Sequence, residues 1–165
     1  MDKEMKANHE ISLKYAKFLY HGTIKTLENR ISFAKGLIPS ESHRFDKNFI
    51  MSKENCLYLT TSLARAIYWA RLISDRQNDE PIILRIKKED IIGMLSPDDN
   101  LEWDETSFQI QNGRIKNFKV IESKDFLNEM DIAYGNGREL RMSEKMEIWD
   151  CIEHNRGFRE PRFIL

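Results

Sequence analysis

The stretch FLYHGT, residues 18–23, and the segment IKTLENRISFAKG that follows it to Gly36 decide the fold of this chain. The first stretch is mostly apolar, as in a half-buried strand, and it ends in a small Gly-Thr pair. Residues 24–34 carry apolar side chains at helical spacing, and Gly36 stands where a helix would end. We therefore predict a strand, a tight turn, a helix and a glycine stop.

A second stretch, CLYLTTSLARAIYWA at residues 56–70, repeats this order of strand and helix. Residues 56–60 read as a strand, and either Thr61 or Ser62 is expected to cap the helix after it. PIILRIK, residues 81–87, is predicted as a third strand that opens with a proline. Residues 37–55 lack a sustained period and predict a long loop.

The remaining segments complete a mixed pattern. Residues 10–17 predict a weak helical or extended lead-in, and residues 106–121 alternate around Asn-Gly, which predicts a hairpin. Two C-terminal helices are expected at residues 123–135 and 143–158, with Gly-Asn-Gly between them. With 165 residues and no linker, the chain predicts one α+β domain over residues 1–165. It has no GxGxxG dinucleotide fingerprint.

Composition excludes several classes of protein. The formal charge is −1, so no global field draws the chain to nucleic acid or membranes. No apolar run approaches the roughly 20 residues of a membrane helix, and no signal peptide is visible, so we expect a cytoplasmic protein without a membrane partner. Cys56 and Cys151 lack metal-like spacing and are expected to be reduced. His9, His43 and His154 lie far apart, so we expect them to face solvent and no metal to bind.

An ordered set of residues carries a resemblance to a known family. A strand ends in His-Gly-Thr, a helix leads to Gly-Leu, a later strand bears a tyrosine, and the next helix bears Ala-x-Tyr. This order resembles the NAD-binding core of the ADP-ribosyltransferases of the poly(ADP-ribose) polymerase and diphtheria-toxin type, over about residues 18–69. The resemblance implies a split antiparallel β-sheet core with surrounding helices. The residues that carry it are His21, Gly22, Thr23, Gly36, Leu37, Tyr58, Ala66 and Tyr68.

The resemblance implies a role for each residue. Gly22 would offer a backbone N–H and C=O to the nicotinamide carboxamide, because a missing Cβ permits close approach. His21 would bond a ribose hydroxyl through one ring nitrogen while a neighbour fixes the other. Tyr58 and Tyr68 would flank the nicotinamide, although Tyr68 could instead pack in the core. The implied NAD-binding set is His21, Gly22, Thr23 at the adenosine ribose, Gly36, Tyr58, Thr60 and Tyr68.

The family also places a catalytic glutamate on a strand beyond the tyrosines, near the ribose 2′-hydroxyl. In this sequence Gln109 matches that position best, Glu105 is its rival and Glu102 is a third choice. A glutamine brings no negative charge to the positive centre that forms at the ribose. The implied catalytic set is therefore His21 and Tyr58, with either Glu105 or Gln109.

These expectations lead to a mono-ADP-ribosyltransferase that uses NAD as substrate, releases nicotinamide and needs no metal. Its acceptor would be a macromolecule, first a protein side chain and alternatively nucleic acid, as in intracellular toxins, phage effectors and host-protein modifiers. The loop 37–55, with Arg44 and Phe45, would border the cleft, and residues 102–104 would contact the acceptor. The alternatives are an RNA 2′-phosphotransferase or nucleic-acid-directed transferase of the same fold, and an inactive module that binds NAD, ADP-ribose or a protein.

Overall fold

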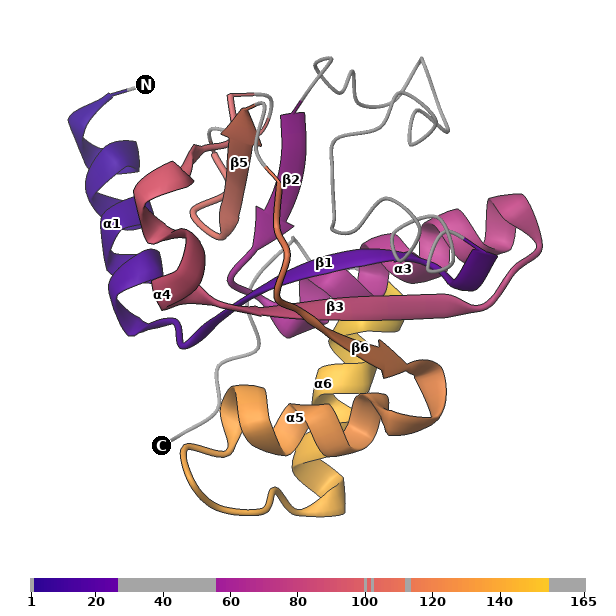
Figure 1. The fold of residues 1–165 in the computed structure, drawn as a ribbon. Coiled ribbons are helices and arrows are strands. Elements are labelled where there is room, and N and C mark those ends of the chain that lie inside the picture. The colour runs from indigo at the N-terminus through magenta and orange to yellow at the C-terminus, as the bar shows by residue number, and fades with distance from the viewer. Residues whose placement is uncertain (1, 27–55, 100, 102, 112–113, 155–165) are drawn as a thin grey trace.

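The structure, a computed structural model, describes residues 2–26, 56–99, 101, 103–111 and 114–154. Helices surround a six-stranded sheet in which every pair of neighbouring strands is antiparallel, so the predicted α+β class is confirmed (Figure 1). The elements are α1 (Lys3–Tyr15), β1 (Phe18–Ile24), β2 (Cys56–Thr60), α3 (Leu63–Gln77), β3 (Pro81–Lys87), α4 (Lys88–Ile91), η2 (Ile92–Met94), β4 (Ser96–Pro97), β5 (Ser107–Gln111), β6 (Lys119–Glu122), η3 (Ser123–Asp125), α5 (Phe126–Tyr134) and α6 (Met142–His154).

The sheet has the strand order β4-β5-β2-β1-β3-β6, and its two central strands, β2 and β1, are paired over a very short length. Strand β1 pairs with β3 along its whole length, from Phe18 opposite Lys87 to Ile24 opposite Pro81. On its other edge β1 pairs with β2 at one position, where Tyr20 lies opposite Thr60. We call the space between β1 and β2 beyond this pair the seam.

Two hydrophobic cores lie on the two faces of the sheet. One contains Tyr20 together with buried residues of α3, α5 and α6, and the other contains Leu19 together with residues of β2, β3 and β5. Strand β3 contributes Ile83 to the first core and both Ile82 and Leu84 to the second. This explains why PIILRIK is apolar without alternation, because a strand covered on both faces has no solvated side.

Helix α3 crosses β1 closely at Gly22. A Cβ at this glycine would lie 2.1 Å from the Ala66 carbonyl oxygen and 3.0 Å from the Ala70 nitrogen. The side of this helix that faces the sheet carries Leu63, Ala66, Ile67 and Ala70, which are buried. Its N-cap is Ser62, whose hydroxyl accepts from the Arg65 N–H at 3.1 Å. The glycine and the small helix residues together let α3 approach the sheet at this point.

The N-terminal lead-in is longer and more regular than predicted, because helix α1 begins at Lys3. Asp2 caps it by accepting from the Met5 N–H at 2.8 Å. The solvent-facing prediction for His9 is wrong: the side chain is 1% exposed and its ring meets Phe108 edge-on, with the centroids 5.6 Å apart. His154, in contrast, is exposed as expected.

The predicted hairpin at residues 106–121 is wrong. Strand β5 pairs with β2 and β4, whereas β6 pairs with β3, so three strands lie between them in the sheet. Alternating apolar and polar residues indicate that one face of a strand is buried, but they do not identify the strand that pairs with it. The apolar side chains of Phe108 and Ile121 therefore enter different cores.

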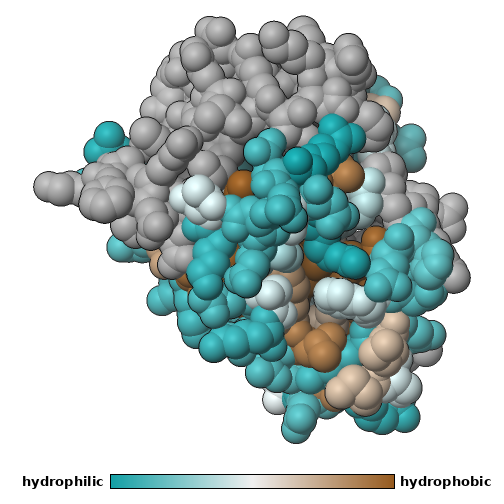
Figure 2. Space-filling model, turned by 90° about the vertical axis from the view of Figure 1, so that its right-hand side faces the viewer, coloured by the Kyte–Doolittle hydropathy of each residue, from teal (hydrophilic) through white to brown (hydrophobic). Residues whose placement is uncertain are grey.

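The predicted pair of C-terminal helices is confirmed as α5 and α6, which lie beneath the sheet in Figure 1. Figure 2 shows the side of the molecule that is on the right in Figure 1, and its coloured part is mainly hydrophilic with small hydrophobic patches. Within the residues that the structure describes, no helix combines the length and apolarity needed to cross a membrane. Both Cys56, buried in β2, and Cys151 are free thiols, as expected.

Candidate functional site

The seam exposes the backbone of β1 at Gly22. Lys25 N–H donates to Glu80 C=O at 2.9 Å and Lys88 N–H donates to Lys17 C=O at 3.2 Å, so the odd-numbered residues of β1 form the hydrogen-bonded pairs with β3. The even-numbered residues direct their N–H and C=O groups toward β2 instead. Because β2 pairs with β1 at Tyr20 alone, the peptide groups of Gly22 face the seam at a level where no described strand pairs with them.

His21 bridges the seam through its side chain. Its Nδ1 lies 2.8 Å from the carbonyl oxygen of Tyr58, and since a carbonyl oxygen only accepts, Nδ1–H is the donor. Burial lowers the pKa of His21 below its ordinary value of 6.5, and the hydrogen bond to Tyr58 opposes this shift only in part. At neutral pH the ring is therefore uncharged, with its proton on Nδ1 and an acceptor lone pair on Nε2.

Tyr58 lies directly opposite Gln109 across the β2–β5 pairing. Cross-strand partners of this kind have Cβ atoms about 4.5–5.5 Å apart and point to the same face. The alternation of β2 from Thr60, the partner of Tyr20, places Tyr58 on the same face as Gly22, which is the face that α3 covers. The structure thus brings Gly22, Tyr58 and Gln109 to one face of the sheet around the seam.

The amide of Gln109 is held by Asp99. The Asp99 N–H donates to Gln109 Oε1 at 3.2 Å, and Gln109 Nε2 donates to Asp99 Oδ2 at 3.1 Å. Gln109 is 6% exposed, whereas Asp99 is exposed. Asp98 N–H donates to the Ser107 carbonyl at 3.1 Å, so Asp99 lies along the edge of β5 that faces away from β2.

Glu105, the rival for the acidic position, lies elsewhere. It is exposed and stands in the turn before β5, two residues before the pair between Ser107 and Thr60. From there to Gln109 is four residues, or about 13 Å along an extended strand. The structure therefore brings Gln109, and not Glu105, beside Tyr58. Glu102, Gly36 and the loop residues Arg44 and Phe45 lie outside the described residues.

Thr23 and Thr60, both predicted to contact NAD, occupy different settings. Thr23 is fully buried, and its hydroxyl has no hydrogen-bond partner within the described part of the chain. Thr60 is also buried, but its hydroxyl donates to Thr106 Oγ1 at 3.1 Å and accepts from Ser62 N–H at 3.0 Å. The hydroxyl of Thr60 thus joins β2 to the segment before β5 and to the start of α3. The hydroxyl of Thr23, one residue beyond Gly22, makes no such connection among the described residues.

Tyr68 and Trp69 lie half-buried on α3. Their rings meet edge-on with centroids 5.3 Å apart, and Tyr68 packs against the core that contains Tyr20. Helix α3, which carries Tyr68, covers the face of the sheet on which Gly22 and Tyr58 lie. Packing therefore accounts for part of the Tyr68 surface, in line with the second of its two predicted roles.

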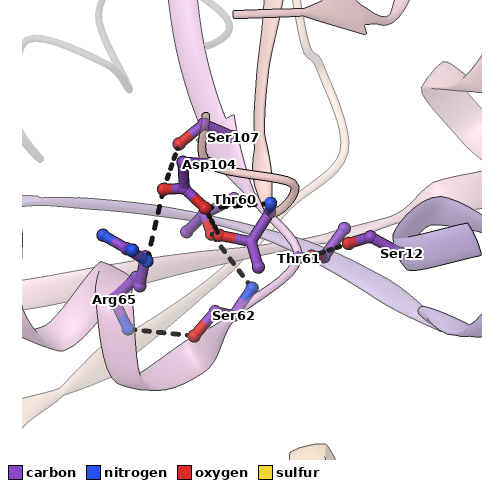
Figure 3. Close-up of polar contacts among 8 residues, drawn as sticks. Ser12, Thr60, Thr61, Ser62, Arg65, Asp104 and Ser107 are labelled. Atoms are coloured by element: carbon purple, nitrogen blue, oxygen red, sulfur yellow. Dashed lines mark hydrogen bonds and ion pairs between the residues drawn. The ribbon is translucent and has the colours of Figure 1, made fainter. Parts of the chain in front are cut away.

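A buried polar cluster joins β2, α3 and β5, and we call it the Arg65 cluster (Figure 3). Arg65 Nε lies 3.2 Å from Asp104 Oδ2, and both side chains are at most 5% exposed. The other carboxylate oxygen, Oδ1, accepts from the N–H of Thr106 at 3.0 Å and from its hydroxyl at 2.7 Å. Ser107 Oγ donates to Oδ2 at 2.9 Å. The cluster fixes the start of β5, and with it the level at which Gln109 meets Tyr58.

Of the three residues expected to contact an acceptor, Asp104 does not fit, because its carboxylate is buried in the Arg65 cluster. Trp103 does remain 54% exposed, with the Arg65 guanidinium 5.7 Å from its ring centroid. Sequence reasoning missed both Asp99 and Arg65. Asp99 sits in an acidic, aperiodic segment, and Arg65 occupies a helix position that no periodic pattern marks as special, so neither had a distinguishing signal.

No group of His, Cys, Asp and Glu side chains suited to a metal ion occurs among the described residues. Compared with protein-family models, curated proteins and solved structures, the chain matches none of them.

Proposed function

We propose that this protein is an NAD-dependent mono-ADP-ribosyltransferase with an NAD-binding split sheet, acting on a macromolecular acceptor. The observation that carries the proposal is the contact between the His21 ring and the Tyr58 carbonyl, across a seam where one residue pair joins β1 to β2. The peptide groups of Gly22 face the same seam. An amide-bearing planar ligand such as nicotinamide fits a site that offers a paired N–H and C=O beside an aromatic ring.

The site residues then have distinct tasks. Gly22 pairs with the nicotinamide carboxamide through its backbone, and the Tyr58 ring lies against the nicotinamide. His21, uncharged and tethered at Nδ1, accepts a hydrogen bond from a ribose hydroxyl at Nε2. Thr23 supplies a buried hydroxyl that a second ribose would satisfy. These contacts hold the nicotinamide and the ribose in a fixed relative orientation. A fixed orientation of the reacting groups lowers the entropic cost of breaking the bond between them.

A second candidate function is a module that binds NAD or ADP-ribose without turnover. Gln109 favours it, because the side chain opposite Tyr58 is an uncharged amide. An RNA 2′-phosphotransferase has less support, since that reaction needs arginines near the cleft. Five described arginines instead pair with carboxylates: Arg65 with Asp104, Arg71 with Glu153, Arg85 with Glu129, and both Arg138 and Arg141 with Glu144.

The test is incubation of the purified protein with NAD labelled in its adenosine part, together with a cell lysate. Mass spectrometry then identifies added ADP-ribose and the molecule that carries it. The control is His21→Ala, which removes the ring that spans the seam. Binding of NAD and of ADP-ribose is measured by calorimetry on both proteins.

Label transfer that requires His21 supports the transferase and identifies its acceptor. Binding that requires His21 without any transfer or release of nicotinamide supports the binding module. A protein that neither binds NAD nor modifies any acceptor contradicts both candidates. Transfer of label to RNA in place of protein would keep the reaction and change the class of acceptor.

A further inference from the structure

We propose that helix α1 holds the two halves of the sheet together where they meet, and that its attachment sets how far the seam opens. The helix acts as a positioning element for the candidate site without contacting a ligand. The attachment is independent of the proposed function, whereas its effect on NAD binding rests on that function.

The two halves of the sheet meet at one residue pair. Strands β4, β5 and β2 form one half and strands β1, β3 and β6 form the other, and Tyr20 opposite Thr60 joins them. Tyr20 directs its N–H and C=O groups toward β2. Thr61 N–H donates to the Thr106 carbonyl, next to β5, at 2.9 Å, so the adjacent Thr60 directs its peptide groups toward β1. This pair is the hydrogen-bonded joint of the sheet, and a joint this short permits the halves to turn relative to each other.

Helix α1 is attached to the half that contains β2 and β5 by two side chains. Ser12 Oγ lies 2.7 Å from Thr61 Oγ1, one residue beyond the joint. The ring of His9, which is 1% exposed, meets the ring of Phe108 on β5 edge-on, with the centroids 5.6 Å apart. His9 and Ser12 are three residues apart, so they lie on the same side of the helix. This side of α1 therefore packs against β5 and the end of β2.

The C-terminal end of α1 is attached to the other half by Lys88. The Lys88 ammonium donates to the carbonyl oxygens of Leu13 at 2.8 Å and Lys14 at 3.2 Å. The last carbonyls of a helix have no partner within it, and a cation there also interacts favourably with the helix dipole. Lys88 directly follows β3, and its own N–H donates to the Lys17 carbonyl, just before β1, at 3.2 Å. One lysine thus fixes the end of α1 beside β1 and β3.

Helix α1 covers the face of the sheet opposite to α3. Leu13 packs against the core that contains Leu19, and His21 lies on the same face because it follows Leu19 by two residues in β1. In Figure 1, α1 lies beside α4 and next to the start of β1. A helix attached to both halves limits the rotation of one half against the other. It therefore sets the distance between His21 Nδ1 and the Tyr58 carbonyl across the seam.

Strand β1 contains both a reporter of the joint and an internal control. Hydrogen exchange at the Tyr20 amide reports opening of the joint, because this N–H faces β2. The amides of Leu19 and Thr23 face β3 and report the pairing of β1 with β3. Local opening exposes one set of amides and leaves the other protected, whereas global unfolding exposes both.

The test compares the full chain with the double variant Ser12→Ala and Lys88→Met, which removes the polar attachments of α1 to both halves. A single hydrogen bond shifts an equilibrium constant roughly fivefold, so we expect exchange at Tyr20 to accelerate about tenfold or more. Exchange at Leu19 and Thr23 is expected to change by less than about threefold, because the pairing of β1 with β3 is untouched. Nuclear magnetic resonance measures all three rates in one experiment.

The matched control is the double variant Ser96→Ala and Lys87→Met, at an exposed serine and an exposed lysine, and it should exchange like the wild type. Should the first double variant fail to fold, the single variants Ser12→Ala and Lys88→Met are expected to show the same selective pattern to a smaller extent. Equal acceleration at the amides that face β2 and β3 would show that α1 contributes only to overall stability, and it would overturn the proposal.

Calorimetry on the same proteins measures the consequence for NAD. The Ser12→Ala and Lys88→Met protein is expected to bind NAD about fivefold more weakly or worse, because a smaller fraction of the chain holds the seam at the bound separation. By linkage, NAD should slow exchange at Tyr20 in the wild type. Selective acceleration at Tyr20 in a chain that does not bind NAD would support the attachment and contradict the transferase function. Unchanged NAD affinity in the double variant would overturn the control of the site by α1.

Discussion

Two polar groups lie at neighbouring levels of β2, and they differ in what surrounds them. In the Arg65 cluster, Arg65 and Asp104 are buried and the carboxylate is bonded through both oxygens. At the seam, His21 Nδ1 donates to the Tyr58 carbonyl at a level where β1 and β2 are not paired. The first group joins three elements through a buried carboxylate, whereas the second is a single contact between two strands.

We therefore expect the Arg65 cluster to act on stability and the residues at the seam to act on binding. The Arg65 cluster contributes to the fold, because removing the buried Asp104 carboxylate would leave Thr106 and Ser107 without their acceptor. The contact between His21 and Tyr58 lies next to the Gly22 backbone, where we propose that NAD binds. Substitutions at the two groups should therefore separate loss of stability from loss of NAD binding.

The largest effect is expected from Asp104→Ala. It leaves the Arg65 guanidinium buried without its carboxylate and also removes the acceptor for Thr106 and Ser107. Loss of one partner from a buried ion pair costs about 3–5 kcal/mol in the free energy of unfolding. Urea unfolding followed by circular dichroism measures it.

The matched control for Asp104→Ala is Glu105→Ala, at the next residue along the chain. Its side chain is exposed, so the free energy of unfolding is expected to change by less than about 0.5 kcal/mol. Glu105→Ala should also retain NAD turnover, because Glu105 does not lie beside Tyr58. Equal destabilisation by the two variants would contradict the structural role of the Arg65 cluster.

The next effect is expected from Gly22→Ala, which affects both stability and the seam. The new Cβ would lie 2.1 Å from the Ala66 carbonyl oxygen, so α3 and β1 must separate. Overpacking of this kind lowers the free energy of unfolding by about 1–3 kcal/mol. The same movement shifts the peptide groups of Gly22, so NAD binding should weaken as well, as calorimetry would show.

Gly93→Ala is the control for Gly22→Ala, because a Cβ at Gly93 meets no atom within 4 Å. That variant should match the wild type in NAD binding. A Gly22→Ala protein of undiminished stability would mean that α3 can move away from β1 freely, and that the close crossing does not define the site.

The sequence predicted the strands of this fold better than it predicted their neighbours. Local patterns identified β1, β2 and β3, and they left the cap of α3 open between Thr61 and Ser62, of which the structure has Ser62. Pairing did not follow, because any half-buried antiparallel strand alternates in the same way, and β5 and β6 were wrongly joined. Helix α1 was largely missed because it buries only His9 and so lacks an apolar stripe.

The candidate site was predictable only where one segment carried it. His21 and Gly22 are adjacent in the chain, so the sequence could place them together on the first strand, but the turn predicted at Gly22 and Thr23 is wrong, because β1 continues to Ile24. The bond between Gln109 and Asp99 depends on how β4 meets β5, and the burial of Asp104 depends on the position of Arg65 on α3. Such contacts arise from tertiary packing, and single residues give no periodic signal for them.

A matched pair of substitutions, Thr60→Val and Thr23→Val, sharpens the comparison further. Thr60→Val removes the acceptor for Ser62 N–H in the framework and should lower the free energy of unfolding by about 1–3 kcal/mol. Thr23→Val removes a buried hydroxyl that has no partner among the described residues, so stability should be unchanged or higher. Urea unfolding of both proteins, side by side, tests this difference.

The same pair should behave in the opposite way toward NAD. Thr23→Val is expected to weaken binding by roughly fivefold to tenfold, the value of one hydrogen bond of about 1 kcal/mol or slightly more. Thr60→Val should bind NAD normally under conditions where it is folded. Destabilisation by Thr23→Val comparable with that of Thr60→Val would show that both hydroxyls serve the framework.

The smallest effect is expected from the pH dependence of His21. Because burial lowers its pKa in the folded protein below 6.5, the unfolded chain takes up a proton first as the pH falls through 6.5. The contribution of His21 to stability is therefore complete above pH 6.5 and declines as the pH falls toward the folded-state pKa. His21→Gln should remove this part of the loss between pH 7.5 and 5.5, measured by urea unfolding at the two values.

NAD affinity should follow the same titration, since a protonated Nε2 donates and no longer accepts. The wild type is expected to bind NAD more weakly at pH 5.5 than at pH 7.5, while His154→Gln, at an exposed histidine on α6, should show the same decline. Affinity that is constant across this range would mean that Nε2 does not accept from the ligand. The contact between His21 and Tyr58 would then serve to close the seam, as the Arg65 cluster serves to close the start of β5.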